Sequence, residues 1–377
     1  MRAARGPGPI FERVILVATL DHGMLRAPPM TLGHQGRVGN STVIQPRELL
    51  VRAQHCPMRS SRSPATSGGD RSCHAGSVVD VPAELAKRQA LMNALASEFA
   101  GQTALSRKWL SRVDFGWGPE RLLDTSKGIW NPRSYAATLT IISDPTGEYD
   151  DGDHGGSLYR YSYEKRPAGQ DPRGGSNAKL REAMELGLPI VMLRKVADGQ
   201  FVPIMPVYVV KEEPENRRFL LALDESLRFL PDPSHLTEDQ RRYAERVARQ
   251  RLHQPEFRAR VLAAYESRCA VCVLQKVPLL DAAHITPDAD QTGQPVVTNG
   301  LTLCKIHHAA YDEAILGISP DYLVHINASV LEEVDGPMLT HGLQQMDGRA
   351  LWVPKRSSDK PDKDRLAARF DAFRAVS

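Results

Sequence analysis

The stretch "LCKIHHAAYD" (Leu303–Asp312) contains a cysteine followed, three and four residues later, by two adjacent histidines. Upstream, "CAVC" (Cys269–Cys272) has the Cys-x-x-Cys spacing of a zinc knuckle. The two half-sites combine into a Cys3His set made of Cys269, Cys272, Cys304 and His307. This set has the ligand number and softness that structural zinc prefers, so the sequence predicts a zinc-stabilised C-terminal fold. The alternative is buried free cysteines without a metal.

The adjacent histidines are expected to serve different sites. Neighbouring residues of an α-helix differ by about 100° around its axis, so His307 and His308 cannot easily bind one metal. His307 shares the helix face of Cys304 and is assigned to zinc, whereas His308 points elsewhere. The alternative is two structural histidines with no metal role.

The order of residues around these half-sites resembles the HNH (ββα-metal) nucleases of the zinc-knuckle kind. His284 comes first, Asn299 follows immediately before a glycine, and Cys304, His307 and His308 close the motif. The resemblance covers about residues 269–312 and implies hydrolysis of phosphodiester bonds. It implies that Asn299 holds the hairpin that carries His284, and His284 itself, in orientation. It also implies that His308 binds a catalytic Mg²⁺ or Mn²⁺.

His284 is the expected general base. A strand histidine can take the proton of a water molecule if a hydrogen bond to one ring nitrogen fixes the ring and leaves the other nitrogen free. A hydrogen bond of this kind is therefore expected at His284.

The motif departs from its family at one position. Many HNH nucleases carry an acidic or histidine metal ligand immediately before the base, where this sequence has Ala283. Asp281 lies on the same side of the strand by period-two alternation and is predicted to supply the missing carboxylate. Asp312, one helical turn beyond His308, is another possible partner. Surface or capping carboxylates are the alternative for both.

The residues before this motif are predicted to form a curved, barrel-like α+β domain. Strand-like runs separated by Gly, Pro, Asp and Asn span residues 135–143, 157–164, 188–196 and 201–212. Four parts are expected along the chain. Residues 1–78 are an N-terminal extension that is either disordered or not part of the true protein, and residues 79–228 form a recognition domain. A helical, arginine-rich connector follows over residues 229–268, and the HNH domain with its C-terminal extension spans residues 269–377. No signal peptide is expected.

Four local helix features are also predicted. The first is an amphipathic helix starting near residue 81, with Leu85, Leu91, Leu95 and Phe99 on its apolar stripe. The second is a short helix with Asn177 as N-cap and Gly187 as its stop. A capping box of Thr237 and Gln240 opens the connector, and Pro255 is expected to break it into two helices.

Residues 110–225 are similar to the N-terminal part of restriction endonucleases that join an SRA (YDG)-like domain to an HNH domain. Such domains flip a modified cytosine out of the duplex and stack it between aromatic side chains. The candidate DNA-binding residues on chemical grounds are Tyr149, Asp151, Tyr159 and Tyr161, with Asp150, Asp153 and Tyr163 beside them. The alternative is that the tyrosines pack the barrel and the aspartates decorate a loop.

The connector carries many arginines, of which Arg258 and Arg268 are candidate phosphate contacts. A solvated helix face is the alternative. The net charge of +3 permits DNA binding without requiring it, and no apolar run is long enough for a membrane span.

The sequence therefore predicts a cytoplasmic, bacterial restriction endonuclease that binds double-stranded DNA carrying modified bases. It would use structural Zn²⁺ and catalytic Mg²⁺ or Mn²⁺, and would cut both strands as a homodimer or in two binding events. The alternatives are an HNH nuclease for unmodified DNA or repair, and a zinc-stabilised DNA-binding protein without activity.

Overall fold

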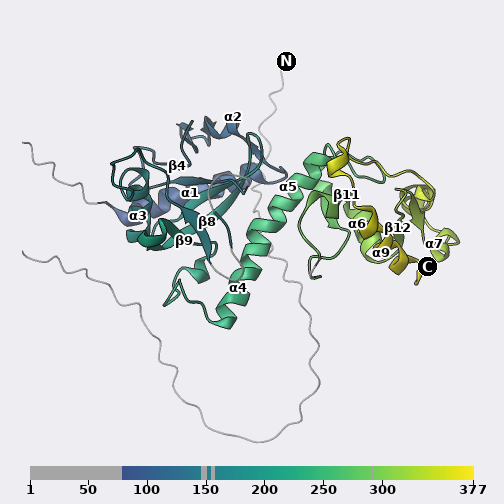
Figure 1. Ribbon diagram of the computed structural model, residues 1–377. Helices are drawn as coiled ribbons and strands as arrows, with labels where there is room; N and C mark the ends of the chain where they lie inside the picture. Colours follow the sequence, from purple (N-terminus) through teal and green to yellow (C-terminus); the bar gives the residue numbers. More distant parts are fainter. Residues whose placement is uncertain (1–78, 146–150, 154–157, 291) are drawn as a thin grey trace, which may run out of the picture. The chain divides into compact units, whose positions relative to one another are not determined.

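The structure is a computed structural model that describes residues 79–145, 151–153, 158–290 and 292–377 (Figure 1). These residues form a mixed α+β fold, and the predicted extension over residues 1–78 lies outside them. The helices are α1 (Val81–Phe99), α2 (Arg107–Leu110), α3 (Ser176–Glu185), α4 (Glu238–Ala248), α5 (Gln254–Ala264), α6 (Lys305–Asp312), α7 (Ala328–Leu331), α8 (Pro337–Gly342) and α9 (Lys363–Arg374). The strands are β1 (Leu105–Ser106), β2 (Val113–Asp114), β3 (Pro119–Glu120), β4 (Ile129–Trp130), β5 (Thr140–Ser143), β6 (Tyr159–Ser162), β7 (Ile190–Ala197), β8 (Gln200–Glu213), β9 (Arg218–Ala222), β10 (Leu280–His284), β11 (Gly300–Cys304), β12 (Leu316–Ile318) and β13 (Val324–Ile326).

Seven strands before the connector form one sheet, in the order β4-β5-β7-β8-β9-β6 with β1 also on β8. The long strand β8 pairs with β7 through its first half, up to Val207, and with β9 from Tyr208 onward. Register shifts interrupt both pairings, and such irregularities bend and twist a strand. The sheet consequently curls into a half-barrel, as the alternation of short strands and turns indicated (Figure 1).

The predicted strand over residues 135–143 is only half formed, because β5 begins at Thr140. The carbonyls of Ala137 and Thr138 accept hydrogen bonds from the guanidinium of Arg88, at 3.0 and 2.8 Å, instead of from a neighbouring strand. A buried arginine needs several acceptors to offset its desolvation, and these carbonyls provide them.

Helix α1 has the predicted position, and its predicted apolar stripe is buried except at Leu85. Leu91 and Leu95 are fully buried, whereas Leu85 is exposed. Glu84 and Arg88 occupy the buried side of the first turns and form an ion pair of 2.8 Å. Hydrophobic periodicity missed this pair because a buried charge pair looks like a solvated face in the sequence.

The N-cap prediction for α3 was wrong, although its stop at Gly187 is confirmed by a left-handed φ of 62°. Gly175 occupies the N-cap position. The fully buried side chain of Asn177 instead binds both backbone groups of Glu164 and the carbonyl of Pro172. Asn177 therefore ties the helix to the preceding loop.

Helices α4 and α5 are continuous, so the predicted break at Pro255 was wrong (Figure 1). A π-helical segment, Arg249–His253, joins them. The backbone N–H of Gln254 donates to the carbonyl of Arg249, five residues earlier, and this wider turn accommodates a proline that lacks its own N–H. The capping box of Thr237 and Gln240 that begins α4 is confirmed.

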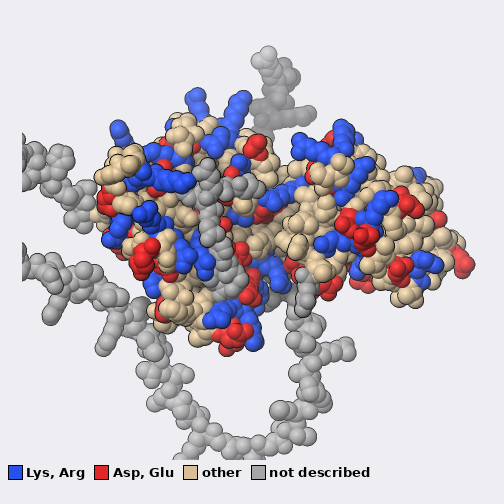
Figure 2. Space-filling view, in the orientation of Figure 1, with Lys and Arg blue, Asp and Glu red and all other residues tan. Residues whose placement is uncertain are grey.

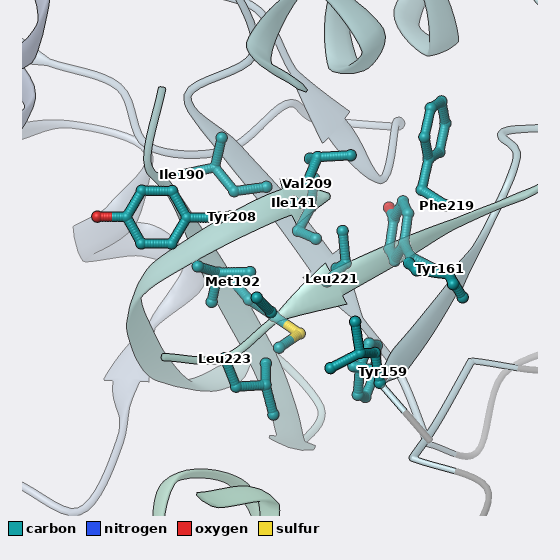
Figure 3. Close-up of a cluster of buried hydrophobic side chains, with 14 of the residues drawn as sticks. Ile141, Tyr159, Tyr161, Ile190, Met192, Tyr208, Val209, Phe219, Leu221 and Leu223 are labelled. Atoms are coloured by element: carbon teal, nitrogen blue, oxygen red, sulfur yellow. The ribbon is translucent and has the colours of Figure 1, made fainter. Parts of the chain in front are cut away.

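One face of the sheet packs on an apolar core that includes the tyrosines of β6. Tyr159 and Tyr161 are 1% and 4% exposed and lie beside Leu221 and Phe219 of β9 (Figure 3). The phenol of Tyr159 is paired with Ser143 Oγ at 2.6 Å, and burial raises its pKa to about 12. Both tyrosines are structural members of this core.

A separate hydrophobic cluster begins at Phe257 and contains most apolar residues of β10, β11, α6 and the following strands. β10 and β11 are antiparallel, with Leu280 opposite Cys304 and His284 opposite Gly300. Helix α6 follows β11 without a gap, so two strands and a helix bring the motif residues together. None of the helices in the described part of the chain is long and apolar enough to span a membrane.

Candidate metal centre and active site

The predicted zinc ligands come together at the junction of three elements. The thiols of Cys269, Cys272 and Cys304 and a ring nitrogen of His307 all lie within 4.8 Å of one another. His307 Nδ1 is 3.1 Å from the sulfur of Cys304 and 3.5 Å from that of Cys269. Three soft thiolates and one imidazole, converging on one point in a largely buried site, fit a structural zinc ion.

Contacts around this Cys3His cluster fix its ligands. His307 Nε2 donates to the carbonyl of Gly342 at 2.7 Å, which turns Nδ1 toward the thiols. The backbone N–H of Ala270 donates to the carbonyl of Thr302 at 2.7 Å, tying the Cys269–Cys272 turn to β11. The cluster therefore connects the end of α5, the hairpin and α6.

His284 lies at the end of β10 with its ring stacked on Phe257 of α5. The ring centroids are 4.1 Å apart and the planes are inclined by 15°. Gly300, opposite His284 in the hairpin, leaves the space for this stack, because a Cβ there would lie 2.9 Å from Cζ of Phe257. The glycine of the motif thus has a steric role in positioning the histidine ring.

Neither ring nitrogen of His284 forms the expected hydrogen bond with any residue that the structure describes. Its Nε2 atom is buried and has no hydrogen-bond partner among the described residues. Burial, opposed by Asp288 and aided by His308, holds the pKa of His284 below its ordinary value of 6.5. Stacking and burial therefore orient a ring that is neutral at pH 7.

Asn299 is fully buried just before β11. Its amide oxygen accepts from the N–H of Thr286 at 2.8 Å, and its amide nitrogen donates to the carbonyls of Thr286 and Gln294, both at 3.0 Å. These bonds hold the segment that leaves β10 against the segment that enters β11.

His308 is directed away from the Cys3His cluster. Its Nδ1 lies 3.7 Å from a carboxylate oxygen of Asp281, and its Nε2 lies 3.5 Å from one of Asp312. Asp281 is also paired with the ammonium of Lys305 and lies 3.8 Å from Nε of Arg258. His308 and Asp281 offer one imidazole and one carboxylate donor in a partly open position.

The two arginines predicted to contact phosphates have protein partners. Arg258 donates to the carbonyl of Leu280 at 2.9 Å, at the start of β10. Arg268 lies over the ring of Trp352, with 5.7 Å between its guanidinium carbon and the ring centroid. Arg258 thus supports the hairpin, whereas Arg268 is half-exposed on an aromatic ring.

Of the candidate DNA-binding residues of the sheet, Tyr159 and Tyr161 belong to a different hydrophobic cluster from that of the HNH motif. Tyr149 and Asp150 lie outside the described residues. Asp151 accepts a hydrogen bond from the N–H of Ser162 at 2.7 Å. Tyr159 and Tyr161 are core residues, so neither ring is open to a nucleobase in this conformation.

Sequence reasoning missed three residues that shape the site: Phe257, Lys305 and Gly342. Phe257 and Gly342 act through contacts that span long sequence distances, and no local pattern reveals these. Lys305 could have been recognised, because it is the first residue of α6 and its ammonium pairs with the carboxylate of Asp281 on β10.

The comparisons with known proteins agree with this geometry. Residues 269–319 match the family model of the HNH endonucleases. This segment is therefore similar to the HNH endonuclease domain. The match includes the whole Cys3His cluster together with His284, Asn299 and His308. No curated protein matches the sequence.

Two solved structures of restriction endonucleases are distantly similar. The modification-dependent TagI restriction endonuclease is 18% identical, with a TM-score of 0.25 over 65% of this chain and 85% of its own. The type IV phosphorothioation-dependent restriction endonuclease ScoMcrA is 16% identical, with a TM-score of 0.22 over 72% of this chain and 58% of its own. TM-scores of this size do not establish a shared fold.

Proposed function

We propose that this protein is a DNA endonuclease that hydrolyses phosphodiester bonds and acts as a restriction enzyme. The observation that carries the proposal is the arrangement within the HNH segment. A closed Cys3His cluster lies beside a neutral, stacked His284 and a partly open pair formed by His308 and Asp281.

His284 acts as the general base in this proposal. A neutral imidazole can accept the proton of the attacking water, and a pKa below 6.5 keeps the ring neutral at physiological pH. Phe257 fixes the plane of the ring, and Asn299 fixes the backbone at the end of β10. Positioning of this kind accounts for a large part of the rate of phosphodiester hydrolysis.

His308 and Asp281 are the residues that would hold a catalytic Mg²⁺ or Mn²⁺. Oxygen and imidazole donors suit these ions, which complete their coordination with water and substrate phosphate. When bound, the ion supplies positive charge to the phosphate and the leaving oxygen. Asp281 would exchange its ion pair with Lys305 for the cation, so Lys305 sets how readily the carboxylate becomes available.

We further propose that the DNA is modified, for example at cytosine. This part of the proposal rests on the resemblance of residues 110–225 to the recognition part of modification-dependent enzymes. Since one HNH site cuts one strand, a double-strand break would need two copies of the chain or two binding events.

The experiment compares plasmids that are unmodified, 5-methylated, 5-hydroxymethylated or phosphorothioated, incubated with the zinc-loaded protein and Mg²⁺ or Mn²⁺. His284→Ala is the matched variant and should cut about 10²–10⁴-fold more slowly while retaining zinc. Intact DNA binding without cutting of any plasmid would exclude the nuclease and favour the DNA-binding alternative. Equal cutting of all plasmids would exclude recognition of a modification.

A further inference from the structure

The β2–β3 hairpin presents an exposed tryptophan on a fixed stem. Trp117 lies in the loop between Asp114 and Pro119 and is 53% exposed. Trp109, Phe115 and Trp117 form a row of rings, with centroids 6.2 Å apart in the first pair and 5.2 Å in the second. Trp109 and Phe115 pack against the buried cluster under α1, so the row leads from the core to the hairpin tip.

The loop that carries Trp117 is held in one conformation by its neighbours. Gly116 and Gly118 have left-handed φ angles of 95° and 115°. Their backbone N–H groups donate to one carboxylate oxygen of Asp114, at 2.8 and 3.3 Å. An anchored aromatic ring loses little conformational entropy on binding, which makes it effective as a contact.

Positive charge surrounds the hairpin. Between residues 105 and 134 the sequence has six Lys and Arg but three Asp and Glu, so this segment is locally basic. Lys108 and Arg112 are exposed, and neither forms an ion pair within the described part of the chain. Figure 2 shows Lys and Arg side chains standing out from the surface around α2.

The carboxylates in the hairpin reduce this positive charge without cancelling it, because three acidic residues stand against six basic ones in this segment. Asp114 is exposed and accepts from the loop N–H groups, and Glu120 is partly buried opposite Val113. Arg112 immediately precedes β2, roughly 10 Å along the strand from the tip. That separation allows a cation to bind a phosphate while the ring meets a base.

We propose that this hairpin is a DNA contact, in which Trp117 inserts against a base of the bound duplex while Lys108 and Arg112 bind flanking phosphates. The inference rests on the proposed function, because DNA is the partner that function requires. Apolar side chains that enter a base step unstack it, and cations on either side offset the cost by neutralising phosphates. The hairpin would thus hold the duplex through a site separate from the HNH residues.

The test measures binding by the full-length, zinc-loaded protein without added Mg²⁺, using a fluorescein-labelled duplex of about 25 base pairs that carries 2-aminopurine. Trp117→Ala should weaken binding about tenfold, the effect of one base stack, without changing the dependence on salt. The double substitution Lys108→Ala/Arg112→Ala should lower the slope of log affinity against log salt by about two. The 2-aminopurine emission should rise with the wild-type protein and not with Trp117→Ala.

Phe229→Ala is the matched control. Phe229 is 72% exposed and lies 5.0 Å from the guanidinium of Arg228, so it is also an exposed aromatic beside a cation, but it lies outside the hairpin. The Phe229→Ala variant should bind the labelled duplex with the affinity of the wild type. Wild-type affinity and emission in Trp117→Ala would overturn the inference, as would absence of DNA binding by the wild type. Binding with these signatures but without cleavage of any plasmid would contradict only the proposed function.

Discussion

The Cys3His cluster and the His284–His308 region are neighbours in the fold, yet their side chains are arranged in opposite ways. In the cluster, His307 is 2% exposed and both of its ring nitrogens have partners. In the other region, His284 Nε2 has no partner and His308 is only loosely placed between two carboxylates. A closed donor set stabilises a fold, whereas unpaired donors remain available for water, an ion or a substrate. From this contrast we propose that one region stabilises the fold and that the other carries the chemistry.

The largest expected effect follows removal of the metal from the Cys3His cluster. Structural zinc contributes about 10–16 kcal/mol in small domains, so a strong chelator, or Cys304→Ser, should unfold the part of the chain that contains α6. Thermal unfolding followed by circular dichroism, with zinc content measured in parallel, would check this. Unchanged unfolding after complete loss of zinc would show that the cluster does not stabilise the fold.

A smaller but more selective effect is expected from Phe257→Leu. Loss of the stacked ring should reduce cleavage about 10²-fold, because His284 would no longer be held in one plane. Leu262→Ala is the matched control, as Leu262 is fully buried in the same helix and cluster. The control should lose about 2–5 kcal/mol of stability and retain its cleavage rate well below its melting temperature. Parallel losses of rate in the two variants would mean that Phe257 is only a core residue.

Glu212→Gln should affect the half-barrel and leave the HNH region unchanged. Arg181, with Arg173 and Tyr163, holds the pKa of Glu212 at about 2, far below its ordinary 4.5. A depressed carboxyl pKa contributes stability that is present above pH 4.5 and is lost as the pH falls through about 2. The variant should therefore lose about 2 kcal/mol at pH 7.

Urea unfolding at a series of pH values would measure this difference, which should shrink toward zero below pH 4.5. A difference that does not change with pH would show that the carboxylate charge is not what stabilises the sheet. The cleavage rate of folded Glu212→Gln should equal that of the wild type.

The smallest expected effect is on the pH–rate profile of cleavage, whose acid limb should be displaced to lower pH. Because burial lowers the pKa of His284, its neutral form persists as the pH falls, and activity should decline only below pH 6.5. Single-turnover rates between about pH 5 and 8 would locate the limb. A limb at or above 6.5 would contradict a buried, neutral base.

Local sequence patterns were sufficient for the features that depend on spacing. The Cys-x-x-Cys and Cys-x-x-His spacings place the ligands together, and the helical angle separates His307 from His308. The capping box at Thr237 is also a local rule, and the structure contains both of its hydrogen bonds. The catalytic and metal-binding roles of these residues remain predictions.

The features that the sequence did not reveal depend on contacts between distant segments. Phe257 reaches His284 because α5 packs on the hairpin, and Asn177 is buried because a loop needs its amide. The π-helical segment before Pro255 likewise keeps a helix continuous where local rules predict a break. In each case tertiary packing overrides a local preference.

The most direct test of the division between the two regions is a comparison of His307→Ala with His308→Ala in the full-length protein, measuring bound zinc, melting temperature and plasmid cleavage on each. His307→Ala should lose zinc and its melting transition. His308→Ala should retain both and lose cleavage about 10²-fold or more, with Mg²⁺ or Mn²⁺ present. Loss of zinc by His308→Ala, or wild-type cleavage by that variant, would contradict the assignment of one histidine to the fold and the other to the reaction.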